Sequence, residues 1–310
     1  MLEKLQSFKP IQPGATIAIV SPASHYKEEK MKRGIDYLHR RGYKTVLAPN
    51  HDKKNKYLTG HGPEQVEDLH WAFSHPGVDA IICTRGGYGT PRYLDKLDYD
   101  LIKNHPKPFV GYSDITALQC AIMTQAQLMT LSGAMVAVEM GDENGIDPYT
   151  EAHFWPILEN GVGGQVYHNP EEEPITVLSP GVGEGRLVGG CFALVNNIMG
   201  TKYFPPMAGN ILVLEDIGEN VQHFDRMLTQ FRLAGIFDQI NGLILGQFLD
   251  CWENAEADDF SLEEIVRDVV GKRHYPIFAN VAYGHGRRKM ALALGAQVRM
   301  DADSRTIAFL

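Results

Sequence analysis

The chain has 310 residues, of which 44% are hydrophobic and 22% are charged, a length that suits one large domain or two of ordinary size. Its 38 acidic and 29 basic side chains give a formal net charge of -9 with histidine neutral. Nucleic-acid and anionic-membrane binders usually present basic surfaces, so we expect neither a nucleic-acid nor a membrane partner. A local basic site for an acidic substrate is still compatible with this charge.

Two further features favour a cytoplasmic protein. The apolar segment 15–20 is too short for a signal-peptide core with its cleavage site, and no segment reaches the roughly 20 apolar residues that span a bilayer. The cysteines have neither metal-finger spacing nor the density of a disulfide framework; they are Cys83, Cys120, Cys191 and Cys251. We therefore expect reduced thiols, no metal and no other cofactor.

The first half of the chain alternates apolar segments with amphipathic ones. The predicted strands are 15–21, 44–48, 79–84 and 108–111, and the predicted helices are 27–41 and 64–73. This βαβ alternation indicates an α/β fold with a mostly parallel sheet and helices on both faces. Active sites of such sheets lie beyond the carboxyl ends of the strands, which is where we look for functional residues.

The second half begins with a looser pattern. Segment 142–185 is rich in proline and glycine and indicates a linker or a set of crossing loops. After it come predicted strands at 211–215 and 243–248, predicted helices near 221–234 and 262–270, and a predicted hairpin over 290–310. We therefore expect an N-terminal α/β domain over 1–150, a linker over 151–182 and a C-terminal domain over 183–310.

One candidate site is the turn Gly111-Tyr112-Ser113-Asp114, between a predicted strand and a helix that begins near Ile115. A serine at such a turn projects its hydroxyl from the top of the sheet, next to the positive end of the helix. Ser113 or Asp114 would serve equally well as the cap of that helix, and the local pattern alone favours this cap. A serine also needs a base before it becomes a nucleophile.

A second candidate is the glycine-rich segment 85–89, directly after the predicted strand 79–84. It has neither the spacing of a dinucleotide fingerprint nor the Lys-Ser/Thr of a phosphate loop. Glycines after a strand often form a plain turn, but they also let backbone amides approach a ligand closely, as an oxyanion hole requires. The segment by itself does not decide between these two interpretations.

The third candidate pairs Glu215, at the end of a predicted strand, with His285, which stands between two glycines. Asp216 and Glu219 make an acidic cluster around Glu215, but the chain lacks a HExxH motif. A loop histidine is the simplest interpretation of His285 alone. Together, Ser113, Glu215 and His285 could supply a nucleophile, an orienting carboxylate and a general base.

These motifs, in this order, resemble those of the serine LD-carboxypeptidases, a family that includes the microcin-immunity peptidases. The resemblance spans nearly the whole chain. The matching segments are 85–89, 92–95, 107–118, Gly189-Gly190, Gly200-Thr201, 214–217, Asp225-Arg226 and Gly284-His285.

The resemblance implies an N-terminal α/β sandwich and a C-terminal domain rich in β-structure. It also implies a Ser-Glu-His triad divided between the domains, with the serine at Ser113, the glutamate at Glu215 and the histidine at His285. The oxyanion hole then consists of the backbone amides of Gly87 and Asp114. The family further implies a homodimer.

The substrate-binding residues are less directly implied. Gly86 is the alternative to the second glycine as an oxyanion donor, and it and Tyr88 are expected to line the substrate site. An exopeptidase must bind a free carboxylate, for which Arg85 and Arg92 are the nearby candidates. Cys191 stands where many members of the family carry asparagine, so any substrate hydrogen bond from that amide is absent.

The family resemblance implies hydrolysis of muropeptide tetrapeptides between an L centre and the terminal D-alanine, through an acyl-enzyme, in cell-wall recycling. A microcin-immunity-like peptidase, which would cleave an aminoacyl-nucleotide amide, is the nearest rival hypothesis. It needs an aromatic platform for the base, for which Trp252 is the only suggestive residue. Two hypotheses from different classes are a non-catalytic ligand-binding module and a hydrolase that uses Glu215 and Glu219 as paired carboxylates.

Overall fold

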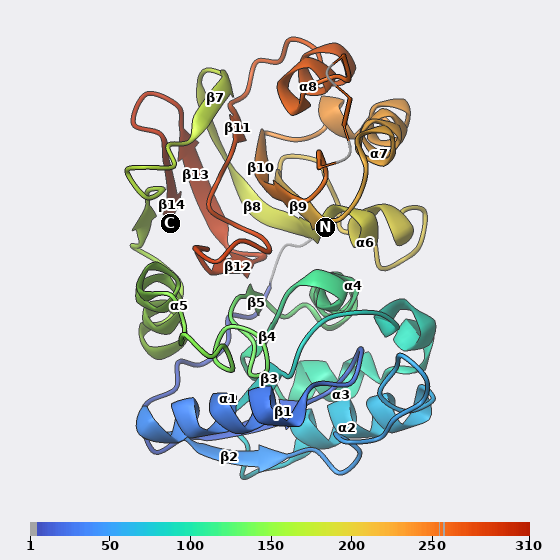
Figure 1. The fold of residues 1–310 in the computed structure, drawn as a ribbon, viewed down its shortest axis with the longest axis vertical. Coiled ribbons are helices and arrows are strands. Elements are labelled where there is room, and N and C mark those ends of the chain that lie inside the picture. Colours follow the sequence, from blue (N-terminus) through green and yellow to red (C-terminus); the bar gives the residue numbers. More distant parts are fainter. Residues whose placement is uncertain (1–4, 254, 257) are drawn as a thin grey trace.

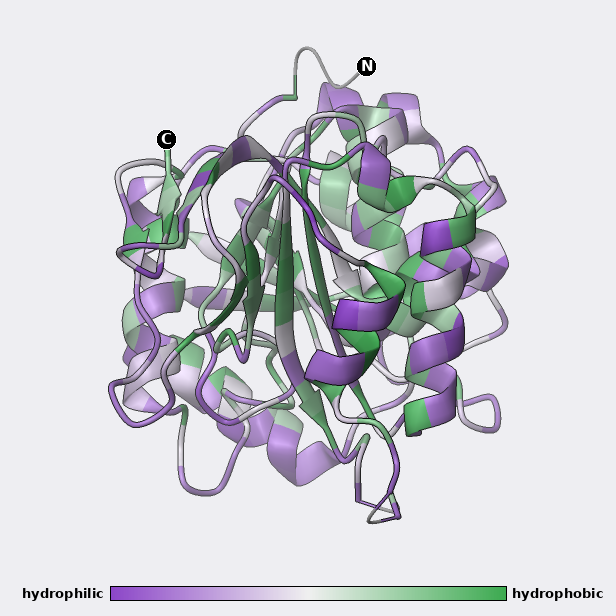
Figure 2. Ribbon diagram, turned by 90° about the horizontal axis from the view of Figure 1, so that it is seen from above, coloured by the Kyte–Doolittle hydropathy of each residue, from purple (hydrophilic) through white to green (hydrophobic). Residues whose placement is uncertain are grey.

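The computed structural model describes residues 5–253, 255–256 and 258–310. Two β-sheets form two lobes, one built mainly from the first half of the chain and one from the second (Figure 1). Viewed from above, the apolar strands lie inside and the helices turn polar faces outward (Figure 2). No helix in the described ranges is both long enough and apolar enough to cross a membrane.

The N-terminal sheet has the strand order β12-β5-β4-β3-β1-β2. Its five parallel strands are β1 (Thr16–Val20), β2 (Lys44–Leu47), β3 (Ala80–Cys83), β4 (Phe109–Gly111) and β5 (Thr130–Ser132). The strands β1 and β3 are rich in β-branched residues and almost wholly buried, as strands covered on both faces must be. The predicted parallel α/β sheet is therefore confirmed.

Helices cover both faces of this sheet because alternate residues of a strand point to opposite sides. Ile17 and Ile19 of β1 pack in a core with Met31 of α1 (Glu28–Arg40). Ala18 and Val20 pack in a second core with residues of α2 (Pro63–Ser74). The remaining N-terminal helical segments are η1 (Thr90–Lys96), α3 (Tyr99–Asn104), η2 (Ser113–Ile115), α4 (Thr116–Ala121) and the π-helical η3 (Ile122–Ala126).

The middle of the chain is more regular than expected. Where the sequence predicts a linker or crossing loops, the structure has α5 (Pro148–Asn160), β6 (Val166–Tyr167) and β7 (Thr176–Ser179). Pro148 occupies the first turn of α5, where its missing N–H costs nothing, and Asp147 accepts a capping hydrogen bond from the Tyr149 amide at 2.9 Å. The proline counted as a loop signal is thus part of a helix start.

The second sheet has the order β6-β14-β13-β8-β9-β10-β11-β7. Its parallel centre consists of β8 (Val182–Cys191), β9 (Ile211–Ile217), β10 (Gly242–Leu249) and β11 (Ile277–Ala279). The hairpin of β13 (Gln297–Asp301) and β14 (Thr306–Phe309) extends one side. The helical segments of this half are α6 (Phe192–Asn197), α7 (Val221–Leu233), η4 (Ile236–Asp238) and α8 (Leu262–Val269). The expected β-rich C-terminal half and its hairpin are confirmed.

One strand links the two lobes. After the loop that carries His285, β12 (Leu292–Leu294) pairs antiparallel with β5 at the edge of the N-terminal sheet. The chain then returns to the second sheet as β13, which pairs with β8. The His285 loop is therefore anchored directly beside the N-terminal sheet, although most of its neighbours in sequence belong to the other lobe.

Candidate active site

Ser113 lies at the sharp turn between β4 and the helical segments η2 and α4. Its backbone has φ 66°, a left-handed conformation that is uncommon for a residue with a side chain and that often marks functional sites. No side chain caps either helical segment, and the Asp114 carboxylate instead accepts a 3.0 Å hydrogen bond from the Thr90 amide. The helix cap that the local pattern favours is therefore wrong.

The glycine-rich segment 85–89, called the glycine loop from here on, lies directly against the turn at Ser113. It follows β3, which pairs in parallel with β4, so the carboxyl ends of both strands meet at one edge of the sheet. A Cβ added to Gly86 would lie 2.8 Å from Cβ of Ser113 and 3.3 Å from the Asp114 amide nitrogen. Only a residue without a side chain permits this approach, which brings the loop backbone close to the serine.

Contacts with Ser24 hold Gly87 and its neighbours in place. Its φ is 125°, and an added Cβ would collide with Oγ of Ser24. Ser24 also accepts a 3.2 Å hydrogen bond from the Tyr88 amide and donates its own amide to the Gly86 carbonyl at 3.4 Å. The Asp114 amide is near the start of a helix, where amides have no intrahelical acceptor. Gly87 and Asp114, whose backbone amides are predicted to form the oxyanion hole, line the same cavity.

Glu215 and His285 come together from positions far apart in the sequence. Nδ1 of His285 lies 2.7 Å from Oε2 of Glu215, and the glutamate is completely buried within β9. Gly284 makes the contact possible, because its φ is 126° and a Cβ there would lie 2.6 Å from the same carboxylate oxygen. A proton on Nδ1 donated to Glu215 leaves the Nε2 atom as a base.

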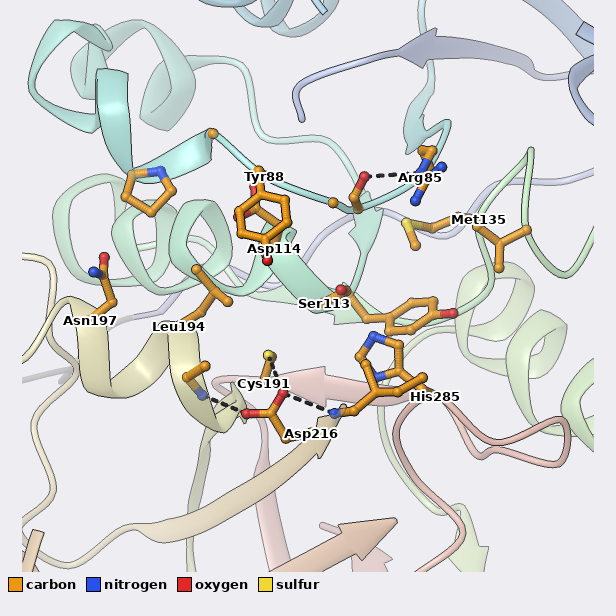
Figure 3. A pocket seen from close by; sticks show the side chains of 18 of the residues that line it. Arg85, Tyr88, Ser113, Asp114, Met135, Cys191, Leu194, Asn197, Asp216 and His285 are labelled. Atoms are coloured by element: carbon orange, nitrogen blue, oxygen red, sulfur yellow. Dashed lines mark hydrogen bonds between the residues drawn. The ribbon is translucent and has the colours of Figure 1, made fainter. Parts of the chain in front are cut away.

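A cavity of about 670 Å³ between the lobes brings the predicted residues together. Ser113 and His285 project into it from opposite sides (Figure 3). Asp114, the glycine loop with Tyr88 and Arg85 also belong to its wall. Glu215 does not line the cavity and lies behind His285, as an orienting carboxylate would.

The cavity wall carries both basic and acidic side chains. Arg85 donates from Nε to the Gly86 carbonyl at 3.2 Å, and neither it nor Arg92 forms an ion pair with a carboxylate in the described part of the chain. Asp216 and Glu219 also line the cavity. Burial is the largest cause that raises the pKa of Asp216, and repulsion from Glu215 adds to it, so this pKa reaches about 6.

Several features of the wall were not predicted from the sequence. Cys191 donates from Sγ to Oδ1 of Asp216 at 3.4 Å, and burial raises the pKa of this thiol well above its usual range. Trp252 is not part of the wall. Its ring packs against Phe224, with ring centroids 5.4 Å apart. The exposed rings of Tyr57 and Tyr88 meet at the cavity instead, with centroids 6.1 Å apart.

The structure supports a pair of catalytic carboxylates, or a metal site in the acidic cluster, less well than it supports the Ser-Glu-His arrangement. Strand β9 continues through Ile217, so Glu215 and Glu219 do not lie on one helix face. Oε2 of Glu219 is instead hydrogen-bonded to Nδ1 of His223 at 2.8 Å. Within the described ranges, no three His, Cys, Asp or Glu side chains are grouped as ligands of a metal ion.

Comparisons with known proteins place the chain in the class of serine carboxypeptidases. A model of the LD-carboxypeptidase N-terminal domain matches residues 17–133, and a model of the LD-carboxypeptidase C-terminal domain matches residues 184–300. The chain therefore belongs to the LD-carboxypeptidase family, as its motifs indicate.

The relatives cover nearly the whole chain. A probable murein peptide carboxypeptidase from Bacillus subtilis is 31% identical over 298 residues, which are 96% of this chain and 92% of that protein. The microcin C7 self-immunity protein MccF from Escherichia coli is 27% identical over 96% of this chain and 94% of its own.

Solved structures show the same two-lobed architecture. Wild-type apo MccF superposes with a TM-score of 0.91 at 25% identity, with 97% of each chain covered. A muramoyltetrapeptide carboxypeptidase from Oxalobacter formigenes superposes with a TM-score of 0.80 at 25% identity, covering 94% of this chain and 97% of that one.

Proposed function

We propose that this protein is a serine LD-carboxypeptidase that hydrolyses the bond before the terminal D-alanine of muropeptide tetrapeptides, in cytoplasmic recycling of the cell wall. The observation that carries the proposal is the 2.7 Å contact of His285 with buried Glu215, beside the same cavity into which Ser113 projects. Relatives named murein peptide carboxypeptidase and murein tetrapeptide carboxypeptidase support this choice of substrate.

The triad residues divide the reaction between them. His285 Nε2 takes the hydroxyl proton of Ser113 as Oγ forms a bond to the peptide carbonyl carbon. Glu215 holds the imidazole in place and favours the imidazolium ion that forms. When the tetrahedral intermediate collapses, the imidazolium gives its proton to the nitrogen of D-alanine, which leaves as the free amino acid. Water, activated by His285, then hydrolyses the acyl-enzyme and restores Ser113.

Two other parts of the wall stabilise charge in this mechanism. The amides of Asp114 and Gly87 donate to the oxyanion of the tetrahedral intermediate, and a single such donor contributes about 3 kcal/mol in other hydrolases. Gly86, which touches Ser113, holds the loop close enough for this. Arg85 binds the terminal carboxylate of the substrate, since it has no carboxylate partner among the described residues and lies in the cavity wall.

The function is tested with a purified muropeptide tetrapeptide and mass spectrometry of the products. We expect stoichiometric release of D-alanine, and covalent labelling of Ser113 by a fluorophosphonate. The variant Ser113→Ala should lose both, while Ser74→Ala, which changes an exposed serine at the end of α2, should still be labelled at Ser113. Full activity of Ser113→Ala would exclude the mechanism, and ligand binding without any turnover would favour the non-catalytic binding module.

A microcin-immunity-like activity is the second candidate, and one specific observation favours it. Tyr57 and Tyr88 form an exposed aromatic pair at the cavity, the kind of platform on which a nucleobase stacks. One solved MccF structure is described as a complex with glutamyl sulfamoyl guanosine. Hydrolysis of such a compound without release of D-alanine from the tetrapeptide would reverse our preference.

We also propose that the protein is a homodimer, as the family resemblance implies. The measurement is the molar mass in solution by light scattering, for which the sequence gives 34.5 kDa per chain. A mass that stays at one chain over a hundredfold range of concentration would contradict the proposal.

A further inference from the structure

A buried ion pair connects the two parts of the chain that carry the nucleophile and its base. Nζ of Lys289 lies 2.5 Å from Oε1 of Glu139, and their side chains are only 5% and 9% exposed. Lys289 follows His285 by four residues in the loop before β12. Glu139 belongs to the segment after β5, in the N-terminal lobe.

Both charged groups also bind Tyr112, the residue that precedes Ser113. The Tyr112 hydroxyl donates to Oε1 of Glu139 at 2.6 Å and accepts from Nζ of Lys289 at 3.0 Å. Nζ also lies 4.2 Å from the centre of the Tyr112 ring, within the range of a cation–π contact. The ring in turn meets the His285 imidazole edge-on, with centroids 5.1 Å apart. Tyr112, which precedes Ser113, is thus connected both to the buried ion pair and to the His285 imidazole.

The other contacts of the pair extend to the cavity and to α5. The second carboxylate oxygen of Glu139 accepts from the amide of Met135, which lines the cavity, at 2.9 Å. The Lys289 amide donates to Oγ1 of Thr150 in α5 at 3.0 Å. Although burial raises the pKa of Glu139, attraction and hydrogen bonding from Lys289, with bonds from Tyr112 and Met135, outweigh it and lower this pKa. The Glu139 carboxylate is therefore ionised, and each of its two oxygens accepts a hydrogen bond.

Stability alone does not explain such a pair. Removing two charges from water costs several kcal/mol for each ion, and replacing a buried pair by apolar residues is often neutral or stabilising. A buried pair does, however, tolerate only a narrow range of geometries, since any separation leaves a desolvated charge without a partner. Here the constrained geometry is that of Tyr112 and the His285 loop.

We propose that Lys289 and Glu139 are positioning residues of the proposed reaction, which fix Tyr112 against the imidazole and so hold Ser113 and His285 in register across the two lobes. Neither Lys289 nor Glu139 lines the cavity. The inference rests on the proposed function, because it concerns the alignment of that nucleophile with that base. Misalignment of about 1 Å can cost about 100-fold in rate.

The experiment replaces the pair by apolar residues of similar size, in the double variant Lys289→Met/Glu139→Leu, so that no unpaired charge is left buried. The readouts are the rate constant for fluorophosphonate labelling of Ser113, kcat and KM for the tetrapeptide, and thermal unfolding. We expect labelling and kcat to fall about 10- to 100-fold, with KM changed less than about threefold. The unfolding temperature should fall by several degrees, because the Tyr112 hydroxyl and the Met135 amide lose their partners. The control is Arg299→Met, which removes an exposed ion pair with Glu184 and should change none of them.

Tyr112→Phe provides a second test that keeps the ring and both charges. It removes only the hydroxyl that links the ring to Glu139, and we expect a smaller fall in both rates, of about 3- to 10-fold. Parent-like labelling and kcat in a folded double variant, or in Tyr112→Phe, would overturn the positioning role while leaving the proposed function intact. A parent protein that is neither labelled at Ser113 nor active would instead remove the proposed function, and the inference with it.

Discussion

Gly86 and Ser113 lie so close that no side chain fits between them, since an added Cβ would be 2.8 Å from Cβ and 3.0 Å from Oγ of the serine. We predict that Gly86→Ala displaces either the glycine loop or the serine. Overpacking of this kind costs about 1 to 3 kcal/mol of unfolding free energy. Because the oxyanion amides and the hydroxyl must align, kcat should fall at least about 100-fold.

Steady-state kinetics and thermal unfolding of Gly86→Ala check this expectation. Gly77→Ala is the matched control, because Gly77 is exposed and its added Cβ would meet only the side chain of His75. The control should keep parent-like kinetics. Activity within about threefold of the parent in Gly86→Ala would show that the loop does not contribute to the transition state.

Glu215→Gln should leave the fold largely intact and remove most of the activity. The substitution preserves the shape of a completely buried side chain but replaces the carboxylate that faces Nδ1 of His285 at 2.7 Å. An amide neither stabilises an imidazolium nor enforces the required tautomer, so we expect kcat to fall about 10³- to 10⁴-fold, with a much smaller change in KM. The same change at exposed Glu184 serves as the control, and equal kcat values for the two variants would exclude Glu215 from the triad.

Arg85→Met should weaken the binding of substrates that end in a free carboxylate. A charge-assisted hydrogen bond contributes about 1.5 to 3 kcal/mol, which corresponds to a rise in KM of about 10- to 150-fold. The sharper measurement compares the tetrapeptide with its C-terminal amide. The parent should prefer the acid by a similar factor and Arg85→Met should show no preference.

The same pair of substrates applied to Arg92→Met distinguishes the two arginines. If Arg92→Met loses the preference and Arg85→Met retains it, Arg92 is the carboxylate-binding residue and the proposed assignment is wrong. Each variant is the control for the other, because both replace an arginine of the same cavity wall by methionine.

Asp216 should make the fold less stable as pH rises. Its pKa in the folded protein is about 6, raised from 3.8 chiefly by burial, so the native state binds this proton more tightly than the unfolded chain does. Stability from this proton is present below about pH 4, is lost as pH rises to about 6, and stays lost above it. The shift corresponds to about 3 kcal/mol.

Urea unfolding of Asp216→Asn at about pH 4.5 and about pH 7.5 tests this linkage. Relative to the parent, the variant should gain about 2 kcal/mol between these two pH values, because it has no carboxyl to ionise. The comparison with the parent removes the contributions of other groups that titrate in both proteins. Parallel pH profiles would show that Asp216 does not titrate in this range.

Much of the fold follows from local pattern in the chain. The β-branched segment that forms β1 and the amphipathic segment that forms α1 are recognisable because alternation and helical spacing are properties of neighbouring residues. The segment around α5 escapes prediction for a local reason too, because Pro148 resembles a loop residue but here begins a helix. The pairing of β12 with the N-terminal sheet has no such signal, because an edge strand of three residues shows no sheet preference of its own.

The sequence by itself identified the family, the α/β class and Ser113, Glu215 and His285 as the candidate triad, because these residues lie in short motifs that the family shares. Only the tertiary structure decided that Glu215 and His285 are in contact, that Gly86 touches Ser113, and that Lys289 and Glu139 form a buried pair beside them. Such contacts join residues far apart in the chain. They depend on strand order and on close packing between lobes, which local pattern does not encode.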